Sequence, residues 1–292
     1  MALEFVPTGG GLGADIKGLD VDNVSESEAD QLRQAFLDFL LLRVRDTDLD
    51  DDRFLRFARV FGELELSPKA IFDGKGWIEG YPELSQVSNK KVDGKNIGSL
   101  SNSELVWHTD MSYIEAPPTA SLLYALEVPE SGGDTGFLNM YTAYETLPDD
   151  LKTAIQGKSV RHDERLNSSG VVRSGYSKDA VENVTEMPGA RHPIIRTHPD
   201  TGRQALFLGR RQNSWVVDMP VDESDDLLDL LWAHATTNPA FTWAQQWKLG
   251  DVVIWDNRCT MHRRDAFDDS QVRHMHRTVI KGDKPFFRAE AA

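Results

Sequence analysis

The sequence predicts a mainly β fold with flanking helices, of the double-stranded β-helix (jelly roll) type. Many short apolar runs are separated by Gly and Pro turn signals, and only a few helical stretches lie among them. No period of roughly 20 to 50 residues repeats, which argues against a solenoid. The chain has 292 residues, a length at which all-β barrels are commonly single domains. We therefore expect one domain over residues 1–292.

The first part of the chain predicts two amphipathic helices. Ser25 and Glu28 form a capping-box pattern, and apolar side chains then recur at helical spacing over residues 26–40. A strand is expected at 40–44. A second apolar stripe at helical spacing follows and ends at Gly62, a residue typical of helix C-termini.

Short strands dominate the rest of the chain. Strands are expected at 121–126, 135–139, 193–196, 204–208, 251–255 and 277–280, and helices at 142–147, 149–156 and 223–235. In the last helix four leucines are expected to face the core, namely Leu227, Leu228, Leu230 and Leu231.

Two polar, irregular stretches read as loop insertions, at about 67–104 and 157–192. Long loops in compact domains often form lids or binding segments, so the first is the main candidate for substrate selection. The alternative is a surface loop without a role.

Composition narrows the classes of partner. The net charge is −15, with 40% hydrophobic and 27% charged residues. Nucleic acids and anionic membranes require a basic footprint, so we expect neither as a partner. No apolar run approaches the roughly 18 residues that span a bilayer, and the first residues lack a leader pattern, so a cytoplasmic location is expected. The single cysteine, Cys259, excludes an internal disulfide.

A His-x-Asp motif at His108 and Asp110 is the most informative feature of the sequence. On a strand, side chains alternate between faces, so both residues can reach one ion. A distant histidine, His262, can complete the set. Two imidazoles and one carboxylate leave three positions open on an octahedral ion, as non-haem Fe(II) oxygenases require. Zinc is the competing metal, because catalytic zinc sites also use three such ligands.

Two arginines follow His262 at short distance. If their segment is a strand, Arg273 and Arg277 share a face and look into the cavity that the metal faces. The guanidinium group stays charged and donates two parallel hydrogen bonds to a carboxylate or sulfonate. On such a strand, His274 and His276 face away and are not expected to be ligands. The pocket is therefore predicted to bind anions.

Together these motifs resemble the taurine and 2,4-dichlorophenoxyacetate dioxygenase family of Fe(II)/2-oxoglutarate enzymes. The resemblance covers nearly the whole chain and rests on motifs in a fixed order, namely His108-x-Asp110, Gly132-Gly-Asp-Thr135, Trp255-Asp-Asn-Arg258, His262, and the pair Arg273 and Arg277. It implies a jelly-roll dioxygenase that uses Fe(II), 2-oxoglutarate as co-substrate and O2. The expected reaction hydroxylates a small anionic substrate (a carboxylate, sulfonate or sulfate ester) with release of succinate and CO2.

The resemblance also implies roles for single residues. His108, Asp110 and His262 would be the catalytic iron ligands. Thr135 and Arg273 would hold the distal carboxylate of 2-oxoglutarate. The residue at position 277 would hold the anionic group of the substrate. Members of the family commonly assemble, so a homo-oligomer is expected.

Other candidate residues have two readings each. Trp255 can form a wall of the co-substrate site or belong to the core. Ser67 stands where taurine enzymes of the family carry a histidine before a proline, which puts taurine itself in doubt; Ser67 and Asn167 are candidate substrate contacts. The pair Arg210 and Arg211 can add a second anion contact, although solvated surface cations are the simpler interpretation.

Two other classes of function remain open from the residues alone. A zinc-dependent hydrolase could use the same three ligands and would have no use for 2-oxoglutarate. A jelly-roll protein without catalytic activity could sense a small acid. Fe(II) and 2-oxoglutarate binding distinguish the oxygenase from both.

Overall fold

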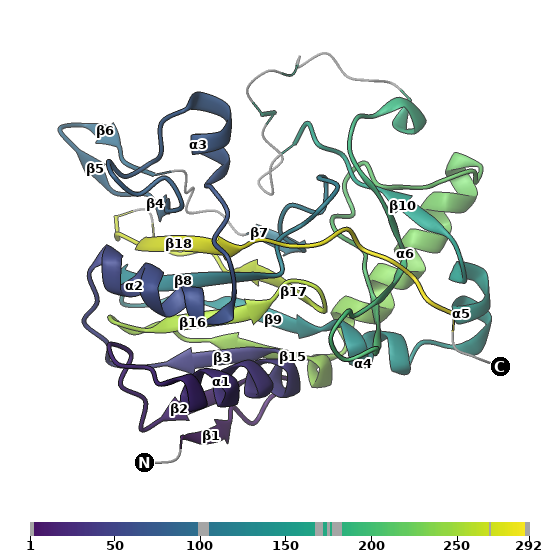
Figure 1. Cartoon of the computed structure of the whole chain (residues 1–292). Coiled ribbons are helices and arrows are strands. Elements are labelled where there is room, and N and C mark those ends of the chain that lie inside the picture. Colours follow the sequence, from purple (N-terminus) through teal and green to yellow (C-terminus); the bar gives the residue numbers. More distant parts are fainter. Residues whose placement is uncertain are drawn as a thin grey trace.

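Two β-sheets form the framework of the computed structural model, which describes residues 3–98, 105–166, 172–173, 176, 183–268 and 270–289. The larger sheet runs in the order β1 (Glu4–Pro7), β2 (Ala14–Lys17), β3 (Leu41–Val44), β16 (Val252–Asp256), β8 (Ala120–Glu127), β18 (His274–Ile280) and β4 (Ser85–Ser88). The smaller sheet runs in the order β15 (Thr242–Gln245), β9 (Thr135–Asn139), β17 (Thr260–Arg264) and β7 (Leu105–His108). The architecture is the predicted jelly roll (Figure 1).

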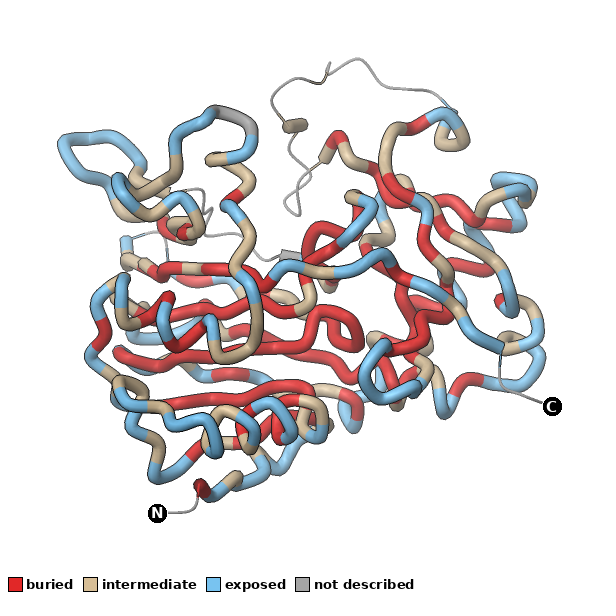
Figure 2. The backbone as a smooth tube through the Cα atoms, in the orientation of Figure 1, coloured by how far each residue is buried: buried red, intermediate tan, exposed pale blue. Residues whose placement is uncertain are grey.

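The main core lies between these sheets. Alternate residues of β8 point to opposite faces, so that Leu123 and Ala125 join a core cluster with Phe137 of β9 and Met261 of β17. Tyr124, between the first two, belongs to a second cluster on the outer face of the larger sheet. The central strands β3, β16 and β9 are buried along their whole length, whereas the edge strands β1 and β15 carry exposed residues (Figure 2). At the end of β7, His108 is buried, although Val106 on the same strand is 66% exposed.

Two helices cover the outer face of the larger sheet (Figure 1). Helix α1 (Glu26–Phe39) begins at the predicted capping box, in which Ser25 and Glu28 bond to each other's backbone. Helix α2 (Asp51–Ala58) continues into the 3-10 turn η1 (Arg59–Phe61), which ends at Gly62 as predicted. Both helices pack apolar stripes against the sheet, which confirms the helical periodicity read from the sequence.

The remaining elements belong to neither of the two large sheets. They are α3 (Pro68–Asp73), β5 (Lys91–Val92), β6 (Lys95–Asn96), α4 (Met140–Glu145), α5 (Asp149–Ile155), β10 (Ser159–Arg161), η2 (Val184–Glu186), β11 (Arg191–Pro193), β12 (Ile195–Thr197), β13 (Gln204–Leu206), β14 (Trp215–Val216), α6 (Val221–Thr237) and η3 (Pro239–Phe241). Both stretches expected to be irregular contain short strands and a helical turn. These strands are only two to four residues long, too short to produce a clear period in the sequence.

Helix α6 corrects one core prediction. Leu227, Leu228 and Leu231 are buried, but Leu230 is 56% exposed. The buried stripe follows the 3.6-residue period through Ser224 and Ala235, and Leu230 lies on the opposite side of the helix.

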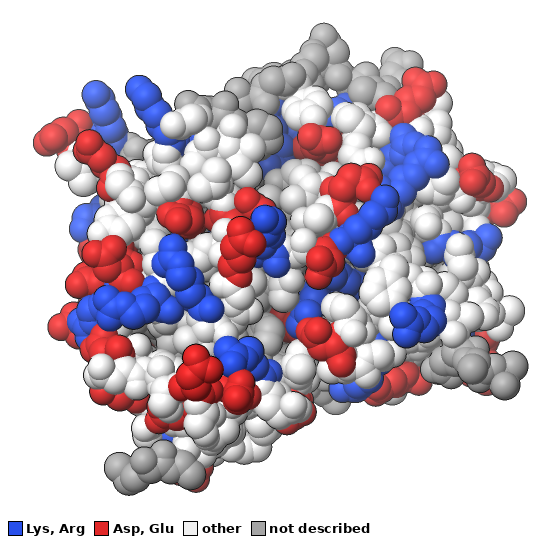
Figure 3. Space-filling view, viewed as in Figure 1, with Lys and Arg blue, Asp and Glu red and all other residues white. Residues whose placement is uncertain are grey.

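Charged side chains are intermingled on the face that carries α1 and α2, where acidic and basic groups lie side by side (Figure 3). Among the described helices, none combines the length and the apolar character that crossing a membrane requires.

Candidate metal centre

Strand pairing brings the two histidines of the site together. Strand β7 ends at His108, which lies opposite His262 in the antiparallel pair of β7 with β17. The centroids of the two imidazole rings are 4.2 Å apart. Asp110 was expected on the same strand as His108, but it lies in the turn after β7. The turn still directs its carboxylate toward both rings.

The three side chains form a compact set of potential metal ligands. His108 Nε2 lies 3.8 Å from Asp110 Oδ1, and His262 Nε2 lies 3.8 Å from Asp110 Oδ2. One ligand atom from each residue lies within 4.8 Å of the others. Two metal–ligand bonds of about 2 Å each span up to about 4 Å, so these separations suit a shared ion. The predicted triad is therefore assembled in the structure.

The protonation states also suit metal binding. His108 Nδ1 donates to the carbonyl oxygen of Val106 at 2.8 Å, so Nε2 carries the free lone pair. Burial keeps the pKa of His108 well below its ordinary value and lowers the pKa of His262 to about 4. Burial alone would raise the pKa of Asp110, but Arg277 and the two histidines hold it below its ordinary value. At neutral pH the site offers two neutral imidazoles and a carboxylate.

The Asp110 carboxylate is held on one oxygen. Ser121 Oγ donates to Oδ2 at 2.9 Å, and Arg277 Nη2 donates to the same atom at 2.6 Å. Arg277 also donates to Ser121 Oγ at 3.1 Å. Oδ1 lies 3.8 Å from His108 Nε2 and accepts no hydrogen bond from the described side chains around it. The sequence reading did not identify Ser121, because a serine within an apolar strand carries no local signal of this contact.

Asn257 fixes the backbone of Asp110. Its Oδ1 accepts from Asp110 N–H at 2.9 Å, and its Nδ2 donates to the carbonyl oxygens of Asp110 and Pro118, each at 3.0 Å. Asn257 is fully buried. It belongs to the Trp255–Arg258 motif, so the sequence indicated its neighbourhood but not its contact with a ligand 147 residues away.

Arg273 and Thr135 form a second polar site. Arg273 is 1% exposed, donates from Nε to Gly133 O at 3.2 Å, and lies with Nη2 3.4 Å from Thr135 Oγ1. Trp247 Nε1 donates to the same hydroxyl at 2.9 Å. Burial lowers the pKa of Arg273 to about 9, and the nearby Arg264 adds to this shift. A buried cation beside a hydroxyl suits a ligand carboxylate.

The sequence predicted that Arg273 and Arg277 lie on one regular strand, but the structure differs. Arg273 lies one residue before β18, and the register of β18 against β8 shifts between His274 and Met275. The two guanidiniums therefore do not follow a simple strand alternation, yet one contacts Thr135 and the other the metal carboxylate. His276 Nδ1 contacts Asp51 on α2 at 2.6 Å, away from the metal, as expected.

Trp255 fits both of its readings. It is 2% exposed and belongs to the main core, and its ring centroid lies 4.9 Å from that of His262. It therefore supports a metal ligand directly. Its role toward the co-substrate stays a prediction.

The remaining candidate residues differ in where the structure places them. Ser67 is buried and caps α3, with its Oγ accepting from Ala70 N–H at 3.3 Å. That cap occupies the hydroxyl, and the substrate role of Ser67 stays a prediction. Asn167 lies outside the described residues. Arg211 pairs with Asp229 on α6 at 2.6 Å.

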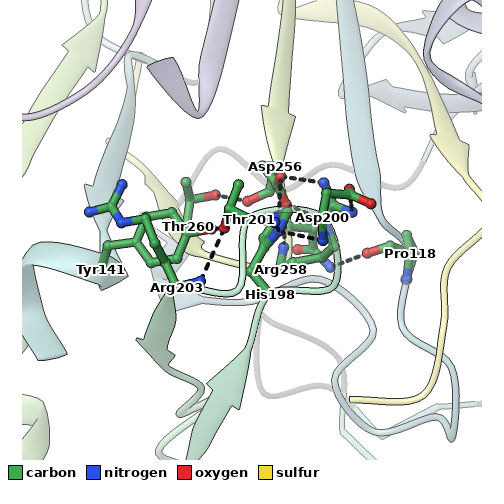
Figure 4. Close-up of polar contacts among 10 residues, drawn as sticks. Pro118, Tyr141, His198, Asp200, Thr201, Arg203, Asp256, Arg258 and Thr260 are labelled. Atoms are coloured by element: carbon green, nitrogen blue, oxygen red, sulfur yellow. Dashed lines mark hydrogen bonds and ion pairs between the residues drawn. The ribbon is translucent and has the colours of Figure 1, made fainter. Parts of the chain in front are cut away.

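A second group of potential ligands is formed by His198, Asp256 and Cys259. His198 and Asp256 belong to a network of hydrogen bonds and ion pairs (Figure 4). His198 Nδ1 accepts two backbone N–H groups, each at 3.3 Å, and Nε2 contacts Asp256 Oδ2 at 3.0 Å. Arg258 donates to both oxygens of Asp256 and, at 2.6 Å, to Asp200. Burial raises the pKa of the Cys259 thiol. The network leaves no imidazole lone pair for a metal and braces the turn that carries Asn257.

Comparisons with known proteins agree with this geometry. Residues 4–279 match the family model described as taurine catabolism dioxygenase TauD, TfdA family. An alpha-ketoglutarate-dependent 2,4-dichlorophenoxyacetate dioxygenase from Burkholderia sp. (strain RASC) is 36% identical over 88% of this chain and 84% of that protein. An alkylsulfatase from Acinetobacter baylyi is 30% identical over 94% of this chain and 83% of that protein.

Solved structures show the same relationship. The structure of AAD-2 in complex with Mn(II) and N-oxalylglycine superposes with a TM-score of 0.78 and 30% identity, over 98% of this chain and 99% of that chain. The matched family model spans nearly the whole chain, including every residue of the metal centre. The protein therefore belongs to the TauD/TfdA family of 2-oxoglutarate-dependent dioxygenases.

Proposed function

We propose that this protein hydroxylates a small anionic organic substrate, a carboxylate, sulfonate or sulfate ester, and releases succinate and CO2. The observation that carries the proposal is the meeting of His108, Asp110 and His262 next to two arginines, one of which contacts the metal carboxylate itself. Named relatives act on 2,4-dichlorophenoxyacetate, phenoxypropionate and sulfonates, which all carry an acidic group.

The residues present fit the iron and the keto acid that the family uses. Fe(II) with bound 2-oxoglutarate supplies the O2-activating chemistry of such enzymes. His108, Asp110 and His262 would hold the metal through two neutral nitrogens and one carboxylate oxygen. Arg273 and Thr135 would hold the distal carboxylate of the keto acid, because Gly133 O and Thr135 Oγ1 fix this buried guanidinium beside a hydroxyl that can donate to a carboxylate.

Arg277 would orient the substrate through its acidic group. Its Nη2 is committed to Asp110 and Ser121, while its Nε is buried and has no hydrogen-bond partner among the described residues. The side chain is 23% exposed, so it can be reached from the pocket. An anion bound here would lie beside the metal, which fixes the carbon that is hydroxylated.

Direct binding and turnover test the proposal. Anaerobic addition of 2-oxoglutarate to the Fe(II)-loaded protein should produce the weak visible charge-transfer band of the chelate, and a panel of small acids should then be screened for succinate release in air. Asp110→Ala should abolish both signals. Asp30→Ala, which changes an exposed carboxylate on α1, is the matched control and should change neither.

Two other classes of function make different predictions. A zinc hydrolase would need zinc and release no succinate, and a binding protein would take up an acid without consuming O2. Succinate release that survives Asp110→Ala would contradict the assigned ligands. We further propose a cytoplasmic location and a homo-oligomeric assembly, which cell fractionation and light scattering can test.

A further inference from the structure

Arg210 lies beside the metal centre although it belongs to neither large sheet. Thr109, between two of the metal ligands, donates its backbone N–H to Gly209 O at 2.9 Å. Gly209 has φ +62°, and a Cβ there would lie 2.1 Å from His162 Nδ1. Only glycine fits here without displacing His162, and the hydrogen bond to Thr109 places the β13–β14 loop next to two of the candidate metal ligands. Arg210 follows directly in the chain.

The two neighbouring arginines of this loop point in different directions. Arg211 forms ion pairs with Asp225 at 3.0 Å and Asp229 at 2.6 Å, both on α6. Arg210 turns inward: its Nη1 donates to Leu166 O at 2.8 Å, and its Nε is buried without a hydrogen-bond partner in the described part of the chain. The expectation that both are solvated surface cations is wrong for Arg210, because this residue is only partly exposed and its guanidinium donates to a backbone carbonyl.

A second guanidinium lies on the same aromatic ring. The Tyr113 ring centroid is 5.3 Å from the guanidinium carbon of Arg210 and 4.0 Å from that of Arg173. Arg173 also donates from Nε to Leu166 O, at 3.2 Å. Among the described residues, neither arginine forms an ion pair. Two like charges held on one ring repel each other, and an anion between them would relieve that repulsion.

The carboxylates close to Arg210 are already paired. Asp163 is bound by Arg165 at 3.1 Å and by Asn213 at 2.7 Å. Asp110 is bound by Arg277 and is a metal ligand in the proposed function. Arg210 therefore has a charge that no described acidic side chain is placed to neutralise.

Charge balance leads to the same conclusion. Fe(II) and Asp110 together carry one positive charge, and the dianionic keto acid turns this into one negative charge. Arg273 and Arg277 then leave the centre with one positive charge, which a single acidic group on the substrate neutralises. Arg210 and Arg173 are additional to this balance. A substrate with only one acidic group would leave them uncompensated.

We propose that Arg210, with Arg173 on the same Tyr113 ring, binds a second acidic group of the substrate, so that the preferred substrate is a dianion. The inference rests on the proposed function, in which Arg277 holds the first acidic group. It makes Arg210 a specificity-determining residue: one end of the substrate is fixed by β18 and the other by the β13–β14 loop, with the hydroxylated carbon between them.

Binding to an inert complex tests this directly. The protein is loaded with Mn(II) and N-oxalylglycine, and calorimetric titration compares phenoxyacetate with 3- and 4-carboxyphenoxyacetate, which add one carboxylate at two distances. At least one of the diacids should bind more tightly than the monoacid. Arg210→Gln should weaken that diacid by roughly 10- to 100-fold, the usual effect of losing a hydrogen bond to a charged group, and change the monoacid by less than about 3-fold.

The neighbouring variant provides the matched control. Arg211→Gln removes the same charge from the same loop and should change neither affinity, because its partners lie on α6. Diacids that bind no better than the monoacid, including the case in which none binds, would overturn the dianion proposal. So would equal weakening of both ligands by Arg210→Gln. The proposed function is judged separately, by the visible band with Fe(II) and 2-oxoglutarate and by its loss in Asp110→Ala.

Discussion

Asn257→Ala should destabilise the metal centre without removing a ligand. The change deletes three hydrogen bonds and leaves the Asp110 N–H and the carbonyl oxygens of Asp110 and Pro118 buried without their partner. Each unsatisfied buried group costs about 1–3 kcal/mol, so the unfolding free energy should fall by about 3 kcal/mol or more. Because Asp110 then loses its fixed backbone, metal affinity should fall by about 10- to 100-fold, as for other groups that orient ligands.

Two measurements separate these effects. Denaturant unfolding of metal-free protein gives the stability change, and electron paramagnetic resonance of free Mn(II) gives the affinity. Asn23→Ala is the matched control, since that asparagine is exposed and bonds only to nearby Asp20; it should cost less than about 0.5 kcal/mol. The reasoning fails if Asn257→Ala loses less than about 1 kcal/mol and binds Mn(II) as the wild type does.

Two further predictions concern other buried groups. Arg273→Ala should weaken 2-oxoglutarate binding by about 2–5 kcal/mol, because a buried carboxylate loses its charged partner, while Mn(II) binding stays unchanged. Titration of the Mn(II)-loaded protein with 2-oxoglutarate measures the change. Equal 2-oxoglutarate affinity of the variant and the wild type would exclude the assignment. Burial lowers the pKa of His192 to about 4. As the pH falls from about 6.5 to about 4, the unfolded chain therefore binds a proton at this histidine that the folded protein does not bind. In this range the histidine lowers the free energy of unfolding by about 1.4 kcal/mol per pH unit. His192→Gln should flatten the acid side of the unfolding profile by that slope, and an unchanged slope would contradict the pKa.

The sequence predicted those parts of the fold that depend on local pattern. The capping box at Ser25 and the glycine stop at Gly62 appear as expected, because both signals act within one helix end. The short strands β10 and β11 were not recognised. They gain their stability from pairing with each other across about 30 residues of chain, which leaves no periodic trace in three residues.

In the candidate metal site, too, some residues could be predicted from the sequence and others could not. The structure brings His108, Asp110 and His262 together, and the sequence pointed to these three because their chemistry is unusual and their order is characteristic. Ser121 and Asn257 were missed as contacts of Asp110, because a polar residue next to a strand has many ordinary uses and only the tertiary fold shows which carbonyl or carboxylate it meets. Arg210 was misread for a similar reason: its position depends on tertiary contacts of the loop, namely the hydrogen bond of Gly209 O with Thr109 and the close approach of Gly209 to His162.

The division between sheet and loop has a consequence for specificity. The residues assigned to iron and keto acid lie on β7, β9, β17 and β18 or within two residues of them. Each of these strands is paired with neighbouring strands of its own sheet. Arg210 and the cap at Ser67 lie outside these sheets. Loop segments can therefore change without moving the ligands, because no strand pairing has to be rebuilt. A fold arranged in this way can keep one oxidative chemistry while its relatives act on acids as different as aryloxyalkanoates and sulfonates.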